Sequence, residues 1–184
     1  MNQNVGDQKN LAGGQLTAQQ RRFWVLEQLE GNAGSHNIPL CLRLRGKLDL
    51  ACLDEATRSV SNRHDVMLFC FVMDGDEPRS YPCRLPYQAL TPFDLTSLSE
   101  DERTRTANTK MSDEIQRPFD LQTGPLFRSA LYRLAPEDHI YLLTFHRIIC
   151  DAGSAQGSLS TDWNYLRMVP VPLILVFAMR SKEY

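Results

Sequence analysis

The sequence lacks the features that would assign it to a membrane, to nucleic acid or to secretion. Its longest apolar-rich run, 168–179, has twelve residues and includes two prolines, whereas a helix needs about 20 apolar residues to cross a bilayer. Lys and Arg number 20 against 22 Asp and Glu, for a formal charge of −2, so no basic surplus points to nucleic acid or an anionic membrane. The N-terminus carries no apolar segment and no cleavage pattern, so we expect no signal peptide.

Paired cysteines are also missing. The five cysteines form no CxxC pair, and their number is odd. This pattern argues against a disulfide framework and against a structural zinc site. We therefore predict reduced thiols, no metal site and a cytoplasmic protein.

What is present is the composition of an ordinary globular protein. The chain has 184 residues, of which 42% are hydrophobic and 23% charged, enough for one domain with its own core. Residues 1–14 are polar and rich in glycine, and we expect them to be disordered. We predict one domain over 15–160 and a divergent tail over 161–184, where the helix and strand patterns fade.

Three helices are predicted from their N-terminal signals. Thr17 with Gln20, and Ser99 with Glu102, have the spacing of a capping box, in which each side chain bonds the backbone N–H of the other residue. Asp49 is a third N-cap. The predicted helices cover 17–31, 49–63 and 99–117.

The first helix is predicted to pack an apolar side against the core. We place Phe23, Val25, Leu26 and Leu29 on that side, with Trp24 as a further core residue. Phe23 and Trp24 could instead form a ligand platform, but core packing is the commoner use of such aromatic residues.

Strands are predicted where apolar residues alternate or run continuously. Residues 67–73 form a near-continuous apolar run, typical of a strand buried on both faces. The predicted strands are 38–45, 67–73, a short returning strand after 74–77, 127–134 and 139–145. Because helices and strands alternate, we predict an α/β fold, a two-layer sandwich in which a mixed β-sheet is flanked by helices.

Five segments of the chain carry the motifs of one known family, in its order and spacing. They are 16–26 (LTAQQRRFWVL), 37–49 (NIPLCLRLRGKLD), 63–71 (RHDVMLFCF), 117–128 (RPFDLQTGPLFR) and 145–152 (FHRIICDA). Together they resemble the condensation domains of nonribosomal peptide synthetases, whose motifs at these places are written SxAQxRLWxL, a first strand with its turn, RHExLRTxF, PFDLxxGPLxR and HHxxxDG. The resemblance covers about 16–160 and corresponds to the N-terminal lobe of the domain.

The resemblance implies a chloramphenicol-acetyltransferase-like half-domain. In the full domain, two such lobes form a tunnel, and two carrier proteins deliver substrates on phosphopantetheine arms. The amine of one substrate attacks the thioester of the other, and an amide forms. The second His of HHxxxDG assists this attack, while the first His and the Asp are mainly structural. By this resemblance the site residues are His146, Arg147 and Asp151, and no cofactor is bound by the lobe itself.

The chain departs from the family at this site. Arg147 occupies the position of the second His, and a guanidinium has no acceptor with which to take a proton. Leu68 stands where the family has the Arg that pairs with the motif Asp, and Ala152 stands where it has Gly. We expect Asp151 to find a new partner, and the preferred one is Arg147, four residues away.

Other readings of these residues remain open. His146 with Cys150 could bind a metal, although a structural histidine is favoured; Asp151 could be a catalytic acid, although a loop-fixing carboxylate is favoured. We expect His36 and His139 to be solvated in loops. Arg21, Arg22, Arg43 and Arg45 could meet an acidic carrier protein, or form an ordinary solvated face.

Two functional hypotheses follow. In the first, the chain is a condensation-domain lobe that takes part in nonribosomal peptide synthesis but needs a second lobe. In the second, it is a non-catalytic, carrier-binding or structural lobe, or a split or truncated gene product. Both imply carrier proteins or synthetase modules as partners, with a second lobe or self-association covering an exposed apolar face.

Overall fold

A five-stranded mixed sheet forms the centre of the fold, with the strand order β5-β6-β7-β2-β8. Its strands are β2 (Asn37–Arg45), β5 (Pro92–Asp94), β6 (Phe127–Ala135), β7 (Asp138–His146) and β8 (Leu173–Phe177). All neighbouring strands are antiparallel except β5, which runs parallel to β6. The structure is a computed structural model that describes residues 14–31, 34–83, 87–150 and 173–177.

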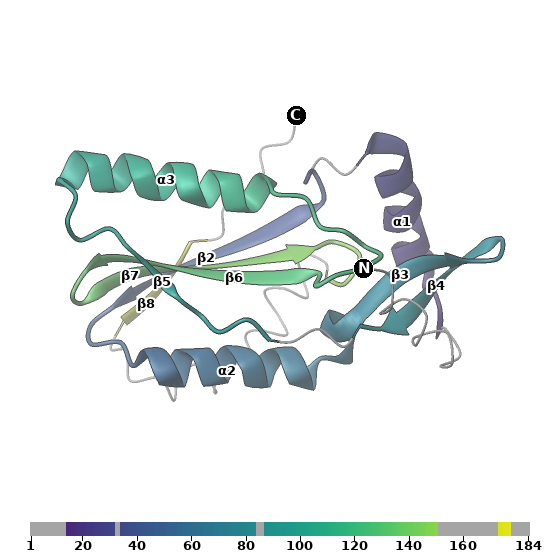
Figure 1. The fold of residues 1–184 in the computed structure, drawn as a ribbon, viewed down its shortest axis with the longest axis horizontal. Coiled ribbons are helices and arrows are strands. Elements are labelled where there is room, and N and C mark those ends of the chain that lie inside the picture. The colour runs from purple at the N-terminus through teal and green to yellow at the C-terminus, as the bar shows by residue number, and fades with distance from the viewer. Residues whose placement is uncertain (1–13, 32–33, 84–86, 151–172, 178–184) are drawn as a thin grey trace.

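Helices cover both faces of this sheet (Figure 1). Helix α2 (Leu50–Arg63) lies on one face, where Leu53 and Ala56 join a core with alternate residues of β2 and β7. Helix α3 (Glu100–Gln116) lies on the other, where Ala107 and Met111 pack with the opposite set. Successive side chains of a strand point to opposite faces, so each strand serves both cores. The α/β class and the flanked mixed sheet are confirmed, but the layers number three rather than the two that we predicted.

The predicted helix caps are present. In α1 (Ala18–Glu30), Thr17 Oγ1 accepts the Gln20 N–H at 3.2 Å, and Gln20 Oε1 accepts the Thr17 N–H at 3.0 Å. Asp49 Oδ1 accepts the Cys52 N–H at 3.0 Å at the start of α2. At the start of α3, Glu102 Oε2 accepts the Ser99 N–H at 3.3 Å. Local sequence signals therefore fix where each helix begins.

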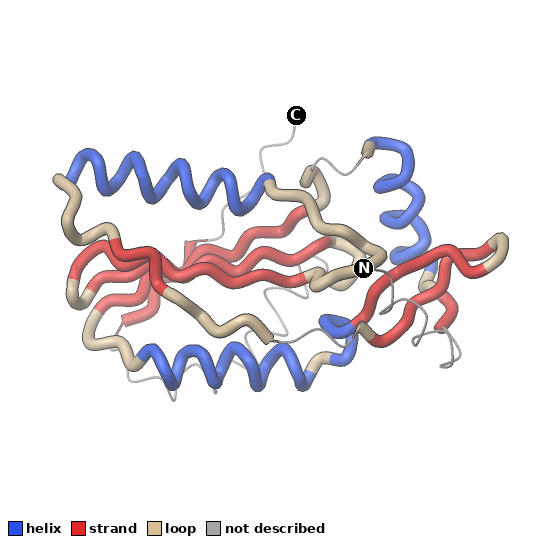
Figure 2. Tube along the Cα trace, in the orientation of Figure 1, coloured by secondary structure: helices blue, strands red, loops and turns tan. Residues whose placement is uncertain are grey.

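A second, three-stranded sheet lies beside α1 at one end of the molecule (Figure 2). Its order is β1 (Gly14–Gln15), β4 (Glu77–Pro82), β3 (Phe69–Asp74), all antiparallel. The run that we predicted as one strand buried on both faces begins instead as a short 3₁₀ helix, η2 (Asp65–Leu68), and Met73 is 48% exposed. The prediction failed at Met73 because β3 projects in a hairpin beyond the core.

Three predictions concern the N-terminal segment, the C-terminal tail and membrane-spanning helices. Gly14, expected to be disordered, belongs to β1 and pairs with Ser80 of β4. The rest of that segment, 1–13, lies outside the described residues. Within the expected tail, β8 pairs antiparallel with β2 from Cys41 to Arg45, and the other residues of 161–184 lie outside the described ranges. No helix in the described part of the chain is long and apolar enough to cross a membrane.

Candidate functional site

The candidate site is the turn that follows β7, residues 146–149, which we call the motif turn. Two backbone hydrogen bonds join it to neighbouring segments, and a third closes the turn itself. The His146 N–H donates to Leu126 O at 3.0 Å, the Arg147 N–H to His36 O at 2.9 Å, and the Ile149 N–H to His146 O at 3.1 Å. The side chain of His146 points inward and is buried, whereas that of Arg147 is exposed.

Behind the motif turn, three buried side chains form what we call the Glu–His cluster: Glu27, His36 and His146. Glu27 Oε2 lies 2.6 Å from His36 Nδ1 and 3.4 Å from His146 Nε2. Glu27 comes from α1, His36 from the turn before β2, and His146 from the end of β7. The β2–β7 register pairs Asn37 with His146, which places the preceding His36 beside the motif turn.

Gly34 begins the turn before β2 that carries His36. It has φ +71°, in the left-handed region, and a Cβ at this position would run into the carbonyl oxygen of Gln116 at the end of α3. Only glycine combines this backbone conformation with so close an approach. Asn37, at the start of β2, also contacts the end of α3: its Nδ2 donates to Ile115 O at 2.7 Å and to Arg117 O at 2.9 Å.

The tautomer of His146 follows from its partners. The Ile148 N–H donates to His146 Nδ1 at 3.1 Å, so Nδ1 is the acceptor and the neutral ring carries its proton on Nε2, facing Glu27. Burial lowers the pKa of His146, against the opposing effect of Glu27. His146 is therefore a neutral hydrogen-bonded group whose one acceptor nitrogen is already occupied.

The three ligand atoms of the Glu–His cluster lie within 4.8 Å of one another, close enough to suggest a divalent cation. A histidine that binds a metal normally donates its other ring N–H to an acceptor. The other nitrogen of His146 faces a donor instead, the Ile148 N–H. The arrangement therefore suits hydrogen bonding better than metal ligation, and Cys150, considered from sequence as a co-ligand of His146, is not a member of the cluster.

Arg147 makes a different kind of contact. Its guanidinium carbon lies 5.3 Å from the centre of the Phe23 ring on α1, within the range of a cation–π interaction. Within the described ranges no carboxylate forms an ion pair with it. Asp151 and Ala152 lie outside those ranges, so the predicted pairing of Asp151 with Arg147 stays a prediction. Leu68 lies half-buried in η2.

Two predictions about histidines were wrong. His36 and His139, expected to be solvated, are 7% and 6% exposed. His139 lies inside β7 opposite Leu44 and Arg133, and His36 is covered by Phe23, whose ring centre is 5.7 Å away. Strand pairing buries His139 and helix α1 buries His36, and a single sequence reveals neither contact.

The prediction for the first helix was wrong at two residues, and sequence reasoning missed Glu27. Val25 and Leu29 are 42% and 77% exposed, while Glu27 is 7% exposed. Glu27 lies one helical turn after Phe23, so the spacing placed both on one face. The charge of Glu27 argued against burial until its partner His36 was known.

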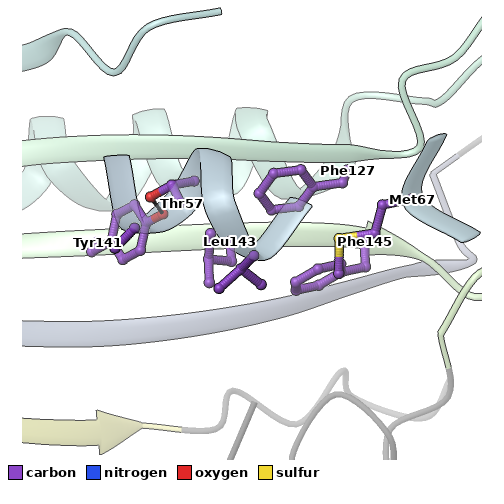
Figure 3. A pocket seen from close by; sticks show the side chains of 8 residues that line it. Thr57, Met67, Phe127, Tyr141, Leu143 and Phe145 are labelled. Atoms are coloured by element: carbon purple, nitrogen blue, oxygen red, sulfur yellow. Dashed lines mark hydrogen bonds between the residues drawn. The ribbon is translucent and has the colours of Figure 1, made fainter. Parts of the chain in front are cut away.

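The structure also contains a small cavity between α2 and the sheet, seen in Figure 3. Its volume is about 20 Å³. Its lining residues are Ala56, Thr57, Val60, Met67, Phe127, Tyr141, Leu143 and Phe145. Thr57 Oγ1 and the Tyr141 hydroxyl lie 2.7 Å apart and form a hydrogen bond with each other (Figure 3). Since so small a space holds at most a water molecule, this cavity is not a substrate site.

Comparison with known families identifies the fold around the motif turn. The family described as the condensation domain matches residues 14–156. The chain belongs to the condensation-domain family. The motif turn of this condensation-domain lobe thus lies inside the matched region, as do β2 to β7.

Similar proteins are large synthetases. The chain is 34% identical over 139 residues to the phosphinothricin tripeptide synthetase PhsC of Streptomyces viridochromogenes, and 33% identical over 139 residues to tyrocidine synthase 3 of Brevibacillus parabrevis. Each match covers 76% of this chain, but the chain spans only 13% of the first protein's length and 2% of the second's.

Solved condensation domains have the same fold. The starter condensation domain of the rhizomide synthetase RzmA matches with a TM-score of 0.72 and 25% identity, over 86% of this chain and 38% of that one. The first condensation domain of the CDA synthetase matches with a TM-score of 0.72 and 23% identity, over 88% and 43%. This condensation-domain lobe therefore corresponds to less than half of each solved chain.

Proposed function

We propose that the chain acts as the N-terminal lobe of a condensation domain, forming one wall of a site where an amide bond is made. The substrates are an acyl thioester and an amine, each held on the phosphopantetheine arm of a carrier protein. The position of Arg147 carries the proposal: its side chain emerges, exposed, from the motif turn within the family match. His146, Arg147 and Asp151 are the proposed site residues.

The chemistry defines what this lobe can contribute. The amine nitrogen attacks the thioester carbonyl, the C–N bond forms, the C–S bond breaks, and the amine loses a proton. Arg147 has no acceptor for that proton, and the acceptor nitrogen of His146 is occupied. The lobe therefore contributes binding and positioning, while water, a substrate group or a second lobe takes the proton.

A second candidate function is a non-catalytic lobe that binds carrier proteins or synthetase modules. The substitution of the motif histidine by Arg147 favours it, because proton transfer by a positioned base contributes about 10²- to 10⁴-fold to a rate. This proposal also includes an exposed apolar face that is covered by a second lobe or by self-association. The exposed large apolar side chains in the described ranges are Val25, Leu29, Met73 and Phe93.

The decisive experiment combines the chain with a donor carrier bearing an acyl thioester and an acceptor carrier bearing an aminoacyl group. It is run with and without the C-terminal lobe of a related condensation domain as a separate chain, and mass spectrometry detects product on the acceptor. Product above that of the carriers alone, only when both lobes are present, supports the amide-forming role. Carrier binding without product supports the second candidate, and neither binding nor product rejects both.

A further inference from the structure

Helix α1 is joined to the motif turn by contacts that converge on a few residues. Glu27 meets His146 Nε2 at 3.4 Å, and the Phe23 ring meets the Arg147 guanidinium at 5.3 Å. His36 completes the connection from the turn before β2. Its Nδ1 lies 2.6 Å from Glu27, and its carbonyl oxygen accepts the Arg147 N–H at 2.9 Å. Both the backbone and the side chain of Arg147 therefore touch parts of this connection.

We propose that Glu27 and His36 are positioning residues that orient the motif turn and so set where Arg147 projects. Glu27 acts through His146, by accepting its Nε2–H, and His36 acts directly on the backbone N–H of Arg147. The inference deepens the proposed function, since it assigns residues outside the motif to the geometry of the site.

The direction of each hydrogen bond supports a positioning role. An ionised carboxylate only accepts, so Glu27 obliges His36 Nδ1 and His146 Nε2 to be donors. With Nε2 as donor, His146 Nδ1 is left as the acceptor that holds the Ile148 N–H at 3.1 Å. Removing the carboxylate removes one of the two groups that select this tautomer and leaves the buried Nε2–H without its acceptor, which weakens the arrangement that fixes the backbone at Ile148.

Burial keeps water from replacing the Glu27 carboxylate. The side chain of Glu27 is 6% exposed and that of His146 is 1% exposed, so water is poorly placed to substitute for the carboxylate. Glu30, on the same helix, lies 3.6 Å from His36 Nε2, but its side chain is 48% exposed. Glu30 is thus at the edge of the Glu–His cluster and provides a matched control.

The test compares Glu27→Leu, Glu27→Gln and Glu30→Gln in the full chain. Leucine roughly fills the space but accepts no hydrogen bond. Glutamine fills the same space, and because His36 Nδ1 and His146 Nε2 both meet Oε2 of Glu27, its carbonyl oxygen in that place can accept from both rings. The readouts are the ¹⁵N signals of the His146 ring nitrogens, which report the tautomer, and the hydrogen exchange rates of the Arg147 and Ile148 amides.

We expect Glu27→Leu to raise exchange at both amides by about tenfold or more, the effect of losing a buried hydrogen bond, while the Leu142 amide in the middle of β7 stays protected. Glu27→Gln should retain the Nε2–H tautomer and most of the protection, and Glu30→Gln should match the wild type.

Equal behaviour of the leucine and glutamine variants would overturn the proposal, because Glu27 would then act through packing alone. A His146 ring protonated on Nδ1 in the wild-type protein would overturn it without any variant, even if Glu27→Leu failed to fold. Since neither readout involves amide formation, this inference and the proposed function can fail separately.

Discussion

The two ends of β7 each bury a histidine, but they hold it differently. At the C-terminal end, His146 has a partner for both ring nitrogens, Glu27 and the Ile148 N–H. At the N-terminal end, His139 is nearly as buried, yet its Nδ1 has no hydrogen-bond partner in the described part of the chain. Burial lowers the pKa of both histidines.

The two ends of β7 therefore differ in whether hydrogen bonding fixes the geometry around the buried histidine. A buried polar atom with matched partners fixes one arrangement of its neighbours, because any other leaves a group unpaired. A buried polar atom without a partner only lowers stability. The end of β7 that carries the motif turn is therefore the end at which hydrogen bonding specifies a single geometry.

Replacing each histidine by leucine should give the largest contrast. His146→Leu leaves the buried Glu27 with one donor fewer and the Ile148 N–H without its acceptor, and we expect a loss of about 3 kcal/mol in the free energy of unfolding. His139→Leu removes an unpaired nitrogen and should change that free energy by less than about 1 kcal/mol. Urea denaturation of both variants measures the difference, and equal losses would contradict the comparison.

Acidification should weaken both ends. A histidine whose pKa is lowered in the folded state binds fewer protons there than in the unfolded chain, whose histidines titrate near 6.5. The stability due to His146 and His139 is thus fully present above about pH 6.5 and is lost as the pH falls toward their folded pKa values. Each contributes a slope of at most about 1.4 kcal/mol per pH unit.

Unfolding free energies measured from about pH 8 to about pH 5 test this prediction, with His139→Leu as the control that removes one of the two contributions. The pKa of the Asp138 carboxyl, lowered by its hydrogen bonds with Arg43, affects stability only at more acidic pH, below about 4. Stability that rises on acidification over this range would show that the two histidines are not held neutral.

A smaller effect is expected from the ion pair beside His139. Arg43 Nε and Nη2 donate to the two carboxylate oxygens of Asp138 at 2.9 and 2.6 Å, but the side chains are 35% and 25% exposed. Pairs this open to solvent contribute little, so a double-mutant cycle with Arg43→Met and Asp138→Asn should give a coupling of about 0.5–1 kcal/mol that salt weakens. A coupling of several kcal/mol would mean that this end is as strongly specified as the other.

The sequence predicted the local parts of this structure and missed those that depend on distant pairing. The caps at Thr17, Asp49 and Ser99 involve residues three positions apart, so the sequence alone predicts them. The Glu–His cluster joins residues 27, 36 and 146, which only the β2–β7 register and the packing of α1 bring together. Charge on Glu27 and the loop-like surroundings of His36 both pointed to the surface, and burial followed from partners that local patterns do not show.

The smallest effect is expected where the motif itself is repaired: Arg147→His should leave amide formation at background in the chain alone. A restored imidazole returns the contribution of proton transfer, about 10²- to 10⁴-fold. Positioning of two substrates can lower a barrier by about 7–11 kcal/mol. The chain corresponds to 38% of the rhizomide synthetase domain, so by itself it offers one wall for that positioning. Arg147 is also exposed, and its replacement should change the unfolding free energy by no more than about 1 kcal/mol.

Three proteins should be compared with loaded donor and acceptor carriers: the wild type, Arg147→His, and Arg147→His combined with Leu68→Arg, which also restores the family's Arg. We expect none to form product above the carriers alone, because each leaves the larger contribution missing. His146 should keep its tautomer in all three, since Arg147 touches the Glu–His cluster through its backbone N–H, which the substitution retains. Product from the single variant would mean that one lobe builds a competent site, by pairing with a second copy or otherwise, and that the imidazole was the contribution that mattered.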